Sequence, residues 1–288
     1  MADVTIEKAR ELGFCFGVRR AIKIIKDAVK EHGRILSIGP VVHNRVVVSK
    51  LADLGVEVVD NYDLPVGTVV AIPSHGAPPW LLIELESRGL RVMDVTCPTV
   101  RRAQNAAKKL ADSGFTVVIY GDADHPEVRG LLGWAGATAV ATIDAGKAAE
   151  KVSGNRLGII AQTTQSMAGF AEFVGSLLRA AGSRVREVRI INTLCQKTQQ
   201  RQDAAMELAR RSDLMIVVGG KNSANTRRLA QVCSSLVETH LIEKPEELDE
   251  TWLAGKRHIG VTAGASTPEE TVDDVVLKLQ AIVDGTGG

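Results

Sequence analysis

One arrangement of residues occurs three times in this 288-residue chain. In each copy an apolar run ends at a single cysteine, and a helical pattern begins directly after it. Twenty-four residues later a glycine closes a β-branched run, and four residues after the glycine comes a His or Ser side chain. These positions are Cys15, Gly39 and His43; Cys97, Gly121 and His125; and Cys195, Gly219 and Ser223. The register predicts three similar units, each contributing one cysteine.

The pattern around each cysteine predicts an α/β fold. Short β-branched runs, such as Phe115–Tyr120 and Leu214–Val218, predict strands, and the stretches between them have apolar residues at helical spacing. Strands that are apolar on both faces and alternate with helices form parallel sheets with right-handed crossovers. We therefore expect three small parallel-sheet α/β domains in a pseudo-threefold trefoil around a central cavity. Their boundaries are residues 1–96, with a short N-terminal segment, 97–194, and 195–288, with a C-terminal helix.

Composition excludes several classes of protein. Hydrophobic residues make up 45% of the chain, which is enough for a substantial core, but aromatic residues are only 3%. The net charge is +1 with dispersed basic residues, so nothing indicates a nucleic-acid platform. The N-terminus has no apolar signal core, and prolines interrupt the longest uncharged stretch, Leu64–Ile83. We expect a soluble, cytoplasmic monomer that binds neither nucleic acid nor membrane.

The three cysteines in register suit a metal centre better than a disulfide, because a cytosolic chain of this size rarely forms disulfides. Zinc is one possible metal, but structural zinc usually has four ligands, often with a paired C-x-x-C spacing that is missing here. Iron–sulfur clusters take thiolates and can recruit them from distant loops. A cubane with three cysteine ligands leaves one iron open to a substrate oxygen. Cys233 lies outside the register and is predicted to be a core residue.

Polar side chains follow the predicted strands at the edge where parallel sheets bind ligands. Each repeat supplies two loops, and together they contain His43, Asn44, Ser74, His75, His125, Glu127, Thr163, Thr164, Ser223, Asn225 and Ser266. Histidines, hydroxyls and amides at helix N-termini suit a diphosphate, although Asn44, Ser223 and Asn225 could equally be helix caps. No P-loop or G-x-G-x-x-G pattern is present. Glu127 is the acid beside the histidines, and it is either a general acid or a residue that favours a helix N-terminus.

At these residues the chain resembles the 4-hydroxy-3-methylbut-2-enyl diphosphate reductase family. The matching segments, in order, are GFCFGV, VVHN, SHG, TCP, HPEV, QTT, Cys195-x-x-Thr198, KNSANT and TAGAS. They run from Cys15 to Ser266, which is nearly the whole chain. The resemblance implies an oxidoreductase of the non-mevalonate isoprenoid pathway, which reductively removes the hydroxyl of (E)-4-hydroxy-3-methylbut-2-enyl diphosphate to give isopentenyl and dimethylallyl diphosphate.

The resemblance also implies roles for individual residues. A [4Fe–4S] cluster held by Cys15, Cys97 and Cys195 would keep one iron open for the C4 hydroxyl of the substrate, and a ferredoxin or flavodoxin would supply two electrons. Glu127 and Thr163 would manage the proton that lets water leave. The substrate-binding residues would be His43, His75, His125, Thr163, Thr164, Thr198, Ser223, Asn225 and Ser266. Spacing leaves open which of Thr163 and Thr164 faces the substrate.

Two rival functions fit the residues less well. A non-redox iron–sulfur hydro-lyase would use the open iron only as a Lewis acid and would need no electron donor. A metal-free protein that binds a phosphorylated metabolite would keep the three cysteines as core residues.

Overall fold

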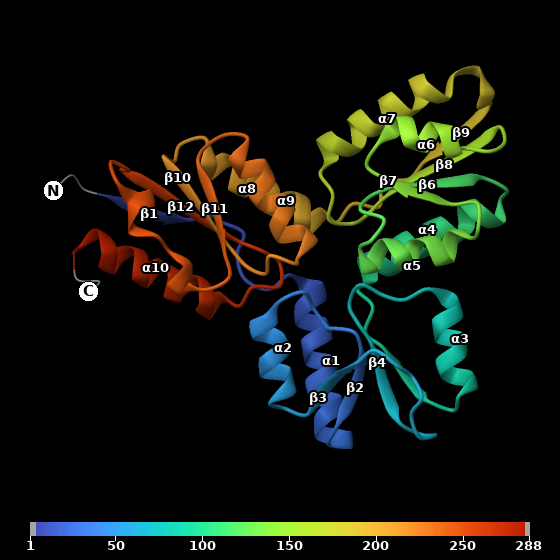
Figure 1. Cartoon of the computed structure of the whole chain (residues 1–288), viewed down its shortest axis with the longest axis horizontal. Coiled ribbons are helices and arrows are strands. Elements are labelled where there is room, and N and C mark those ends of the chain that lie inside the picture. Colours follow the sequence, from blue (N-terminus) through green and yellow to red (C-terminus); the bar gives the residue numbers. More distant parts are fainter. Residues whose placement is uncertain (1–3, 286–288) are drawn as a thin grey trace. The chain divides into compact units, whose positions relative to one another are not determined.

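The computed structural model describes residues 4–285 of the chain, and within them the strands form three four-stranded parallel sheets (Figure 1). The first sheet has the order β3 (Val56–Val59), β2 (Ile35–Ile38), β4 (Val69–Ile72), β5 (Arg91–Asp94). The second has the order β7 (Val140–Thr142), β6 (Thr116–Tyr120), β8 (Arg156–Ala161), β9 (Glu187–Ile190). The third has the order β11 (Thr239–Ile242), β10 (Leu214–Val218), β12 (His258–Ala263), β1 (Thr5–Lys8).

Helices form most of the connections between the parallel strands. They are α1 (Phe16–His32), α2 (Arg45–Ala52), α3 (Pro79–Ser87), α4 (Pro98–Asp112), α5 (Pro126–Ala135), α6 (Ala145–Lys151), α7 (Met167–Ala181), α8 (Gln196–Ala209), α9 (Ala224–Ser234) and α10 (Glu269–Val283). Short 3₁₀ turns occur at Gly182–Arg184, Pro245–Glu247 and Glu250–Leu253. The α/β class with three parallel sheets is therefore confirmed, whereas the domain boundaries and the trefoil around a cavity stay predictions.

The N-terminal strand β1 belongs to the third sheet, not to the first. In the first two sheets the strand that leads to the next cysteine, β5 or β9, is the edge strand beside β4 or β8. In the third sheet β1 occupies the same edge beside β12 and leads to Cys15, with Thr5 paired to His258. Every cysteine thus follows an equivalent edge strand. The sequence analysis did not predict β1, nor the short β7 and α6.

The contacts group the described chain into two compact units. One contains the third sheet together with residues 43–49, and the other contains the first and second sheets.

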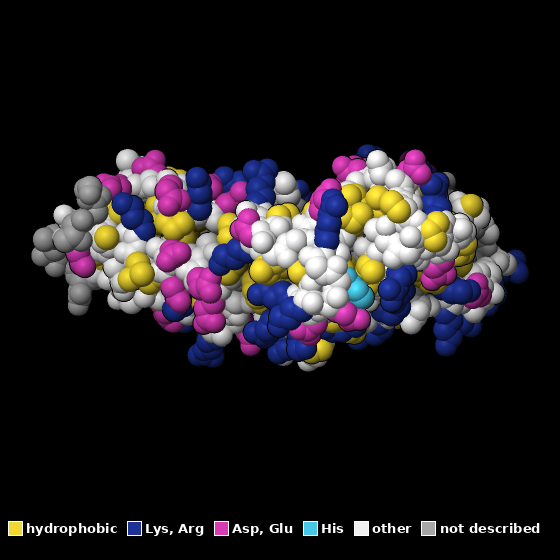
Figure 2. Space-filling model, turned by 90° about the horizontal axis from the view of Figure 1, so that it is seen from below, with side chains coloured by type: hydrophobic (Ala, Val, Ile, Leu, Met, Phe, Trp, Pro, Cys, Tyr) yellow, Lys and Arg dark blue, Asp and Glu magenta, His cyan; other side chains and the backbone are white. Residues whose placement is uncertain are grey.

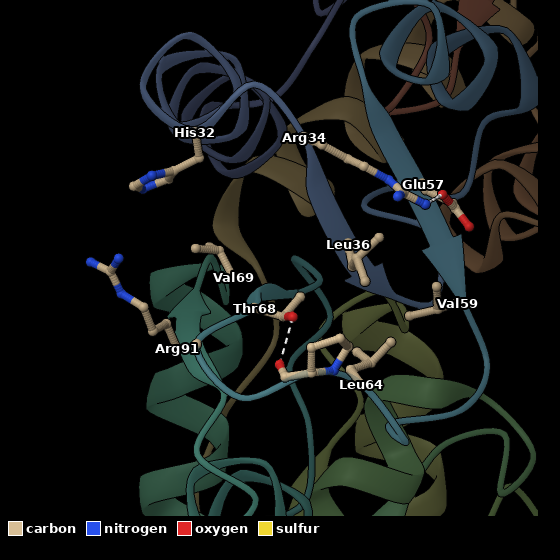
Figure 3. A pocket seen from close by; sticks show the side chains of 11 residues that line it. His32, Arg34, Leu36, Glu57, Val59, Leu64, Thr68, Val69 and Arg91 are labelled. Carbon is tan, nitrogen blue, oxygen red and sulfur yellow. Dashed lines mark hydrogen bonds and ion pairs between the residues drawn. The ribbon is translucent and has the colours of Figure 1, made fainter.

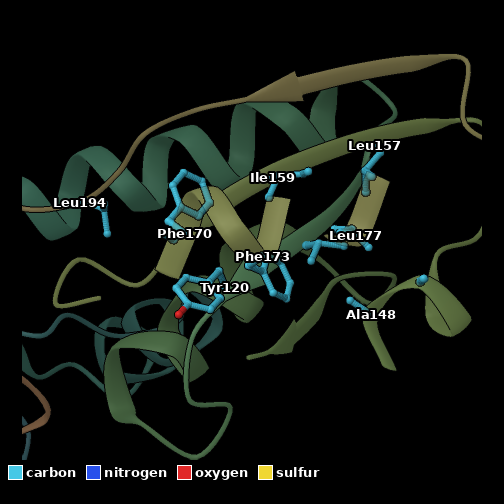
Figure 4. Packing of buried hydrophobic residues seen from close by; sticks show 11 residues of the cluster. Tyr120, Ala148, Leu157, Ile159, Phe170, Phe173, Leu177 and Leu194 are labelled. Atoms are coloured by element: carbon cyan, nitrogen blue, oxygen red, sulfur yellow. The ribbon is translucent and has the colours of Figure 1, made fainter. Parts of the chain in front are cut away.

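The second sheet shows why these sequences become strands buried on both faces. Along β6, Val118 and Tyr120 point to one face, and Val117 and Ile119 point to the other. The first face packs on α6 and α7, where Tyr120 contacts Phe173 with ring centroids 4.8 Å apart (Figure 4). The second face packs on α4 and α5. This alternation, with period two, uses apolar residues at every position and so requires helices on both sides.

No helix among residues 4–285 is long and apolar enough to cross a membrane. On the face in Figure 2, Lys and Arg side chains lie among Asp and Glu side chains. This agrees with the dispersed charge expected from the sequence.

Candidate active site

An equivalent turn follows each of the strands β4, β8 and β12, and each turn holds the backbone of one cysteine. Each turn is closed by a backbone hydrogen bond, from Gly76 N to Pro73 O (2.9 Å), Gln165 N to Gln162 O (3.1 Å), and Thr267 N to Gly264 O (3.0 Å). The carbonyl of the second residue of each turn accepts the amide of a cysteine. The pairs are Cys97 N to Ser74 O (2.9 Å), Cys195 N to Thr163 O (2.9 Å) and Cys15 N to Ala265 O (3.0 Å). The threefold register of the sequence is thus a register of hydrogen bonds.

The three cysteines share one local setting. The side chains of Cys15, Cys97 and Cys195 are half-buried, and each cysteine directly precedes the first residue of α1, α4 or α8. Cys233 differs, because it is fully buried and burial raises the pKa of its thiol to about 12. The prediction that Cys233 is a core residue is confirmed.

A cluster would find suitable donors in these three cysteines, since thiolates at helix N-termini are the ligands that iron–sulfur centres use. Cys97 and Cys195 lie in the unit with the first and second sheets, and Cys15 lies in the other unit. Within residues 4–285 no three His, Cys, Asp or Glu side chains are grouped as a metal site. The convergence of the three sulfurs therefore stays a prediction.

Glu127 is buried at the start of α5, with 3% of its surface exposed, and Thr163 holds its carboxyl group. The Thr163 amide donates to Oε1 at 2.6 Å, and the Thr163 hydroxyl pairs with Oε2 at 2.8 Å. The carbonyl of the same threonine accepts the Cys195 amide. Thr163 therefore connects a buried acid to a predicted metal ligand. Both the amide and the hydroxyl of Thr163 contact Glu127.

Burial raises the pKa of Glu127 from its ordinary 4.5 to about 7, against the two Thr163 hydrogen bonds, which lower it. A carboxyl with this pKa is available as a proton donor near neutral pH. The folded protein holds this proton more tightly than the unfolded chain does. Stability from this group is therefore complete below pH 4.5 and is lost as the pH rises from 4.5 to about 7, by about 3 kcal/mol.

His125 caps the same helix through its side chain. Its Nδ1 accepts the Glu127 amide at 3.1 Å, so in the neutral ring the proton resides on Nε2. That tautomer presents an N–H donor, the group that a diphosphate oxygen accepts from. His125 thus caps α5 through Nδ1.

The unit with the third sheet contains His43, Ser223, Asn225 and Ser266 among the predicted residues. The Ser266 hydroxyl donates to the His43 carbonyl at 3.3 Å, and Ser223 caps α9 by accepting the Thr226 amide at 3.3 Å. Asn225 is 6% exposed, and its buried Nδ2 has no hydrogen-bond partner among the described residues. Burying a polar group without a partner costs about 1–3 kcal/mol, so Asn225 is suited to donate to a ligand. Burial, and then nearby Arg227, lower the pKa of His43.

The remaining predicted residues have simpler settings. Asn44 caps α2, because its Oδ1 accepts the Val47 amide at 3.2 Å, so the capping alternative holds for this residue. Thr198 is buried in α8, and Thr164 is half-buried beside Thr163. His75 is half-buried in the turn after β4. Sequence reasoning missed the arginines that hold the cysteine loops, although Arg20 and Arg102 stand at the same distance from Cys15 and Cys97.

Gly76 is a position in this site where a side chain would not fit. Its φ of +78° favours glycine, and an added Cβ would lie 2.4 Å from Gln104 Nε2 and 3.2 Å from Thr96 Cγ2. We expect Gly76→Ala to lower the free energy of unfolding by about 2–4 kcal/mol, from left-handed strain and crowding together. Gly33→Ala is the control, since its φ of +74° is similar and nothing lies within 4 Å. If urea unfolding showed the same loss of stability for both variants, crowding around residue 76 would not contribute to the loss.

A cavity of about 530 Å³ lies elsewhere, at the first sheet. Figure 3 shows its rim, with His32 and Arg91 on one side and the Arg34–Glu57 ion pair on the other. None of the predicted site residues lines it. It lies at the amino ends of β2, β4 and β5. The turn that holds Cys97 lies at the opposite edge of this sheet.

Comparison with known proteins gives one family throughout. The profile of the LytB protein family matches residues 6–280. The 4-hydroxy-3-methylbut-2-enyl diphosphate reductase of Dehalococcoides mccartyi (strain CBDB1) is 47% identical, over 97% of this chain and 99% of that protein. The reductases of Geobacter sulfurreducens and Aquifex aeolicus are 43% and 40% identical, covering 94% and 99% of this chain and 95% and 98% of their own lengths.

Solved structures agree. One structure of (E)-4-hydroxy-3-methyl-but-2-enyl diphosphate reductase, described as the terminal enzyme of the non-mevalonate pathway, has 39% identity and a TM-score of 0.67 over 97% of this chain and 99% of that one. The corresponding reductase from Plasmodium falciparum has 26% identity and a TM-score of 0.89, over 96% and 88%. Neither rival function finds support among these relatives. The chain belongs to the LytB family of 4-hydroxy-3-methylbut-2-enyl diphosphate reductases, which are oxidoreductases.

Proposed function

We propose that this protein reduces (E)-4-hydroxy-3-methylbut-2-enyl diphosphate to isopentenyl and dimethylallyl diphosphate, using a [4Fe–4S] cluster held by Cys15, Cys97 and Cys195. The observation that carries the proposal is the double role of Thr163. Its amide and hydroxyl hold the buried Glu127 carboxyl, and its carbonyl holds the Cys195 backbone. A proton donor and a cluster ligand are thus fixed by one residue at the carboxyl end of the second sheet.

The reaction balances with two electrons and two protons for each substrate. The C–O bond of the alcohol breaks, the oxygen leaves as water, and a new C–H bond forms on the allylic product. When bound, the cluster supplies electrons from a ferredoxin or flavodoxin and a Lewis-acidic iron with an open position. We place the reaction in the cytoplasm, with the protein as a monomer.

The residues of the chain supply the protons and the binding. Protonated Glu127 can pass its proton to the Thr163 oxygen while the Thr163 hydroxyl donates onward, because the two oxygens are 2.8 Å apart. His125, with its donor on Nε2, His75 and His43 would bind the diphosphate. Ser223, Asn225 and Ser266 would join them, and Thr164 and Thr198 would complete the substrate pocket. Charge-assisted hydrogen bonds of this kind contribute about 1.5–3 kcal/mol each.

The test is an anaerobic assay of the purified chain with iron and sulfide analysis. We expect a brown protein with about four irons per chain that consumes the substrate only when a reduced donor is present. Turnover without a donor would favour the hydro-lyase. A colourless protein without turnover under any donor would favour the metal-free binding protein.

A further inference from the structure

Each repeat carries an arginine in its first helix, shortly after its cysteine. Arg20 and Arg102 follow Cys15 and Cys97 by five residues, and Arg201 follows Cys195 by six. Neither diphosphate binding nor proton transfer uses these side chains. Their hydrogen bonds show what they hold.

Arg20 and Arg102 each bind the backbone just before a cysteine that lies far away in the sequence. Arg20 Nη1 donates to the carbonyl of Thr96 at 3.3 Å, and Thr96 directly precedes Cys97. Arg102 Nη2 donates to the carbonyl of Leu194 at 3.1 Å, and Leu194 directly precedes Cys195. Both contacts lie within the unit that contains the first and second sheets.

Arg201 performs the same task in the other unit and is the most buried of the three, with 4% of its surface exposed. Its Nη2 donates to the Gly13 carbonyl and its Nη1 to the Ala263 carbonyl, both at 2.9 Å. Gly13 lies two residues before Cys15. Ala263 ends β12, two residues before the carbonyl that accepts the Cys15 amide. One guanidinium therefore holds both the segment that leads to Cys15 and the end of β12.

We infer that Arg20, Arg102 and Arg201 are positioning residues for the three cysteine ligands. Along the chain, each arginine follows one cysteine and holds the loop that leads to the next, so the three clamps close a cycle from Cys15 to Cys97, to Cys195 and back to Cys15. This inference rests on the proposed cluster.

The order of the cysteine loops favours ligand binding. Each cysteine amide is tied to a neighbouring turn, and the carbonyl before it, or two residues before it, is tied to a guanidinium. The loop is therefore ordered before the metal binds, so less conformational entropy is lost on binding.

The test compares cluster release in the reconstituted full chain under anaerobic conditions. Arg102 is the residue to change, because it is exposed and its loss leaves no buried cavity. We expect Arg102→Ala to release iron to a ferrous chelator about tenfold faster than the wild type, in line with the effect of losing other residues that support metal ligands. Arg102→Lys, which keeps a charged donor, should recover part of the difference.

Lys108→Ala is the matched control, since Lys108 is an exposed base on the same helix that pairs with Asp112 at 2.6 Å. It should release iron at the wild-type rate. Arg201→Lys extends the test to the buried clamp, and the melting temperature of each apoprotein separates loss of fold from loss of ligand order.

The outcomes are distinct. Equal release rates for the wild type, Arg102→Ala and Lys108→Ala would overturn the inference and leave the proposed function intact. A faster release that follows apoprotein stability alone, without recovery in Arg102→Lys, would also overturn it. A wild-type chain that binds no iron at all would overturn the proposed function itself.

Discussion

Cys97→Ser is expected to give a colourless protein whose turnover falls to background. Serine keeps the size of the side chain and the amide that donates to Ser74 O. Its hydroxyl stays protonated at neutral pH, so it does not replace the thiolate as a ligand. With two thiolates left, we expect iron content to fall from about four per chain to nearly zero. Iron and sulfide analysis after anaerobic purification, followed by the donor-coupled assay, measures both effects.

Cys233→Ala is the matched control for this prediction. It also removes one thiol, but from a fully buried position in the apolar cluster of α8, α9 and β10. We expect full iron content and activity, with a loss of stability of about 1–2 kcal/mol from the small cavity. If Cys97→Ser kept its iron while Cys233→Ala lost it, the assignment of ligands would be wrong.

Glu127→Gln is expected to lower kcat by about 10²–10⁴-fold while iron content stays at the wild-type level, because the amide cannot deliver a proton. In the wild type, kcat should decline as the pH rises through about 7, the value to which burial raises the pKa of Glu127. The variant should lack this decline. Rates measured between pH 5.5 and 9, a range chosen to span that pKa by about two units, test both statements.

Thr163→Val sharpens the assignment. It removes the hydroxyl at 2.8 Å but keeps the amide bond to Oε1. Loss of a hydrogen bond that lowers the pKa of Glu127 should move the decline to higher pH. Glu172→Gln, an exposed acid on α7, is the control and should leave the profile unchanged. A profile that is the same in all four proteins would remove Glu127 from proton transfer.

Most of the fold followed from the sequence because its signals are local. The apolar runs that became β6 and β10 lie within about one residue of the predicted bounds. β1 was missed because TIEK is half polar and its partner β12 lies some 250 residues away. β7 was missed because three half-buried residues at a sheet edge leave too short a pattern.

The candidate site also has features that local sequence patterns predicted and features that they did not. The cysteine register is a regular spacing in the sequence, and equivalent hydrogen bonds of the three turns repeat it in the structure. The sequence does not show whether Thr163 or Thr164 points towards Glu127. Neighbouring residues of one loop have no periodic pattern from which the direction of a side chain could be predicted. The arginine clamps join residues 76, 92 and 188 positions apart, which no local pattern reports.

The place of β1 at the edge of the third sheet has a consequence for biosynthesis. The ribosome makes Thr5–Lys8 before the other strands described here, and their partner strand His258–Ala263 is the last of these strands to be made. Until then the nascent chain carries an unpaired strand and the Cys15 loop without the carbonyl that anchors it. The Cys15 loop is therefore the first of the three cysteine loops to be synthesised and the last to be anchored, so we expect insertion of the proposed cluster to wait until His258–Ala263 has been made.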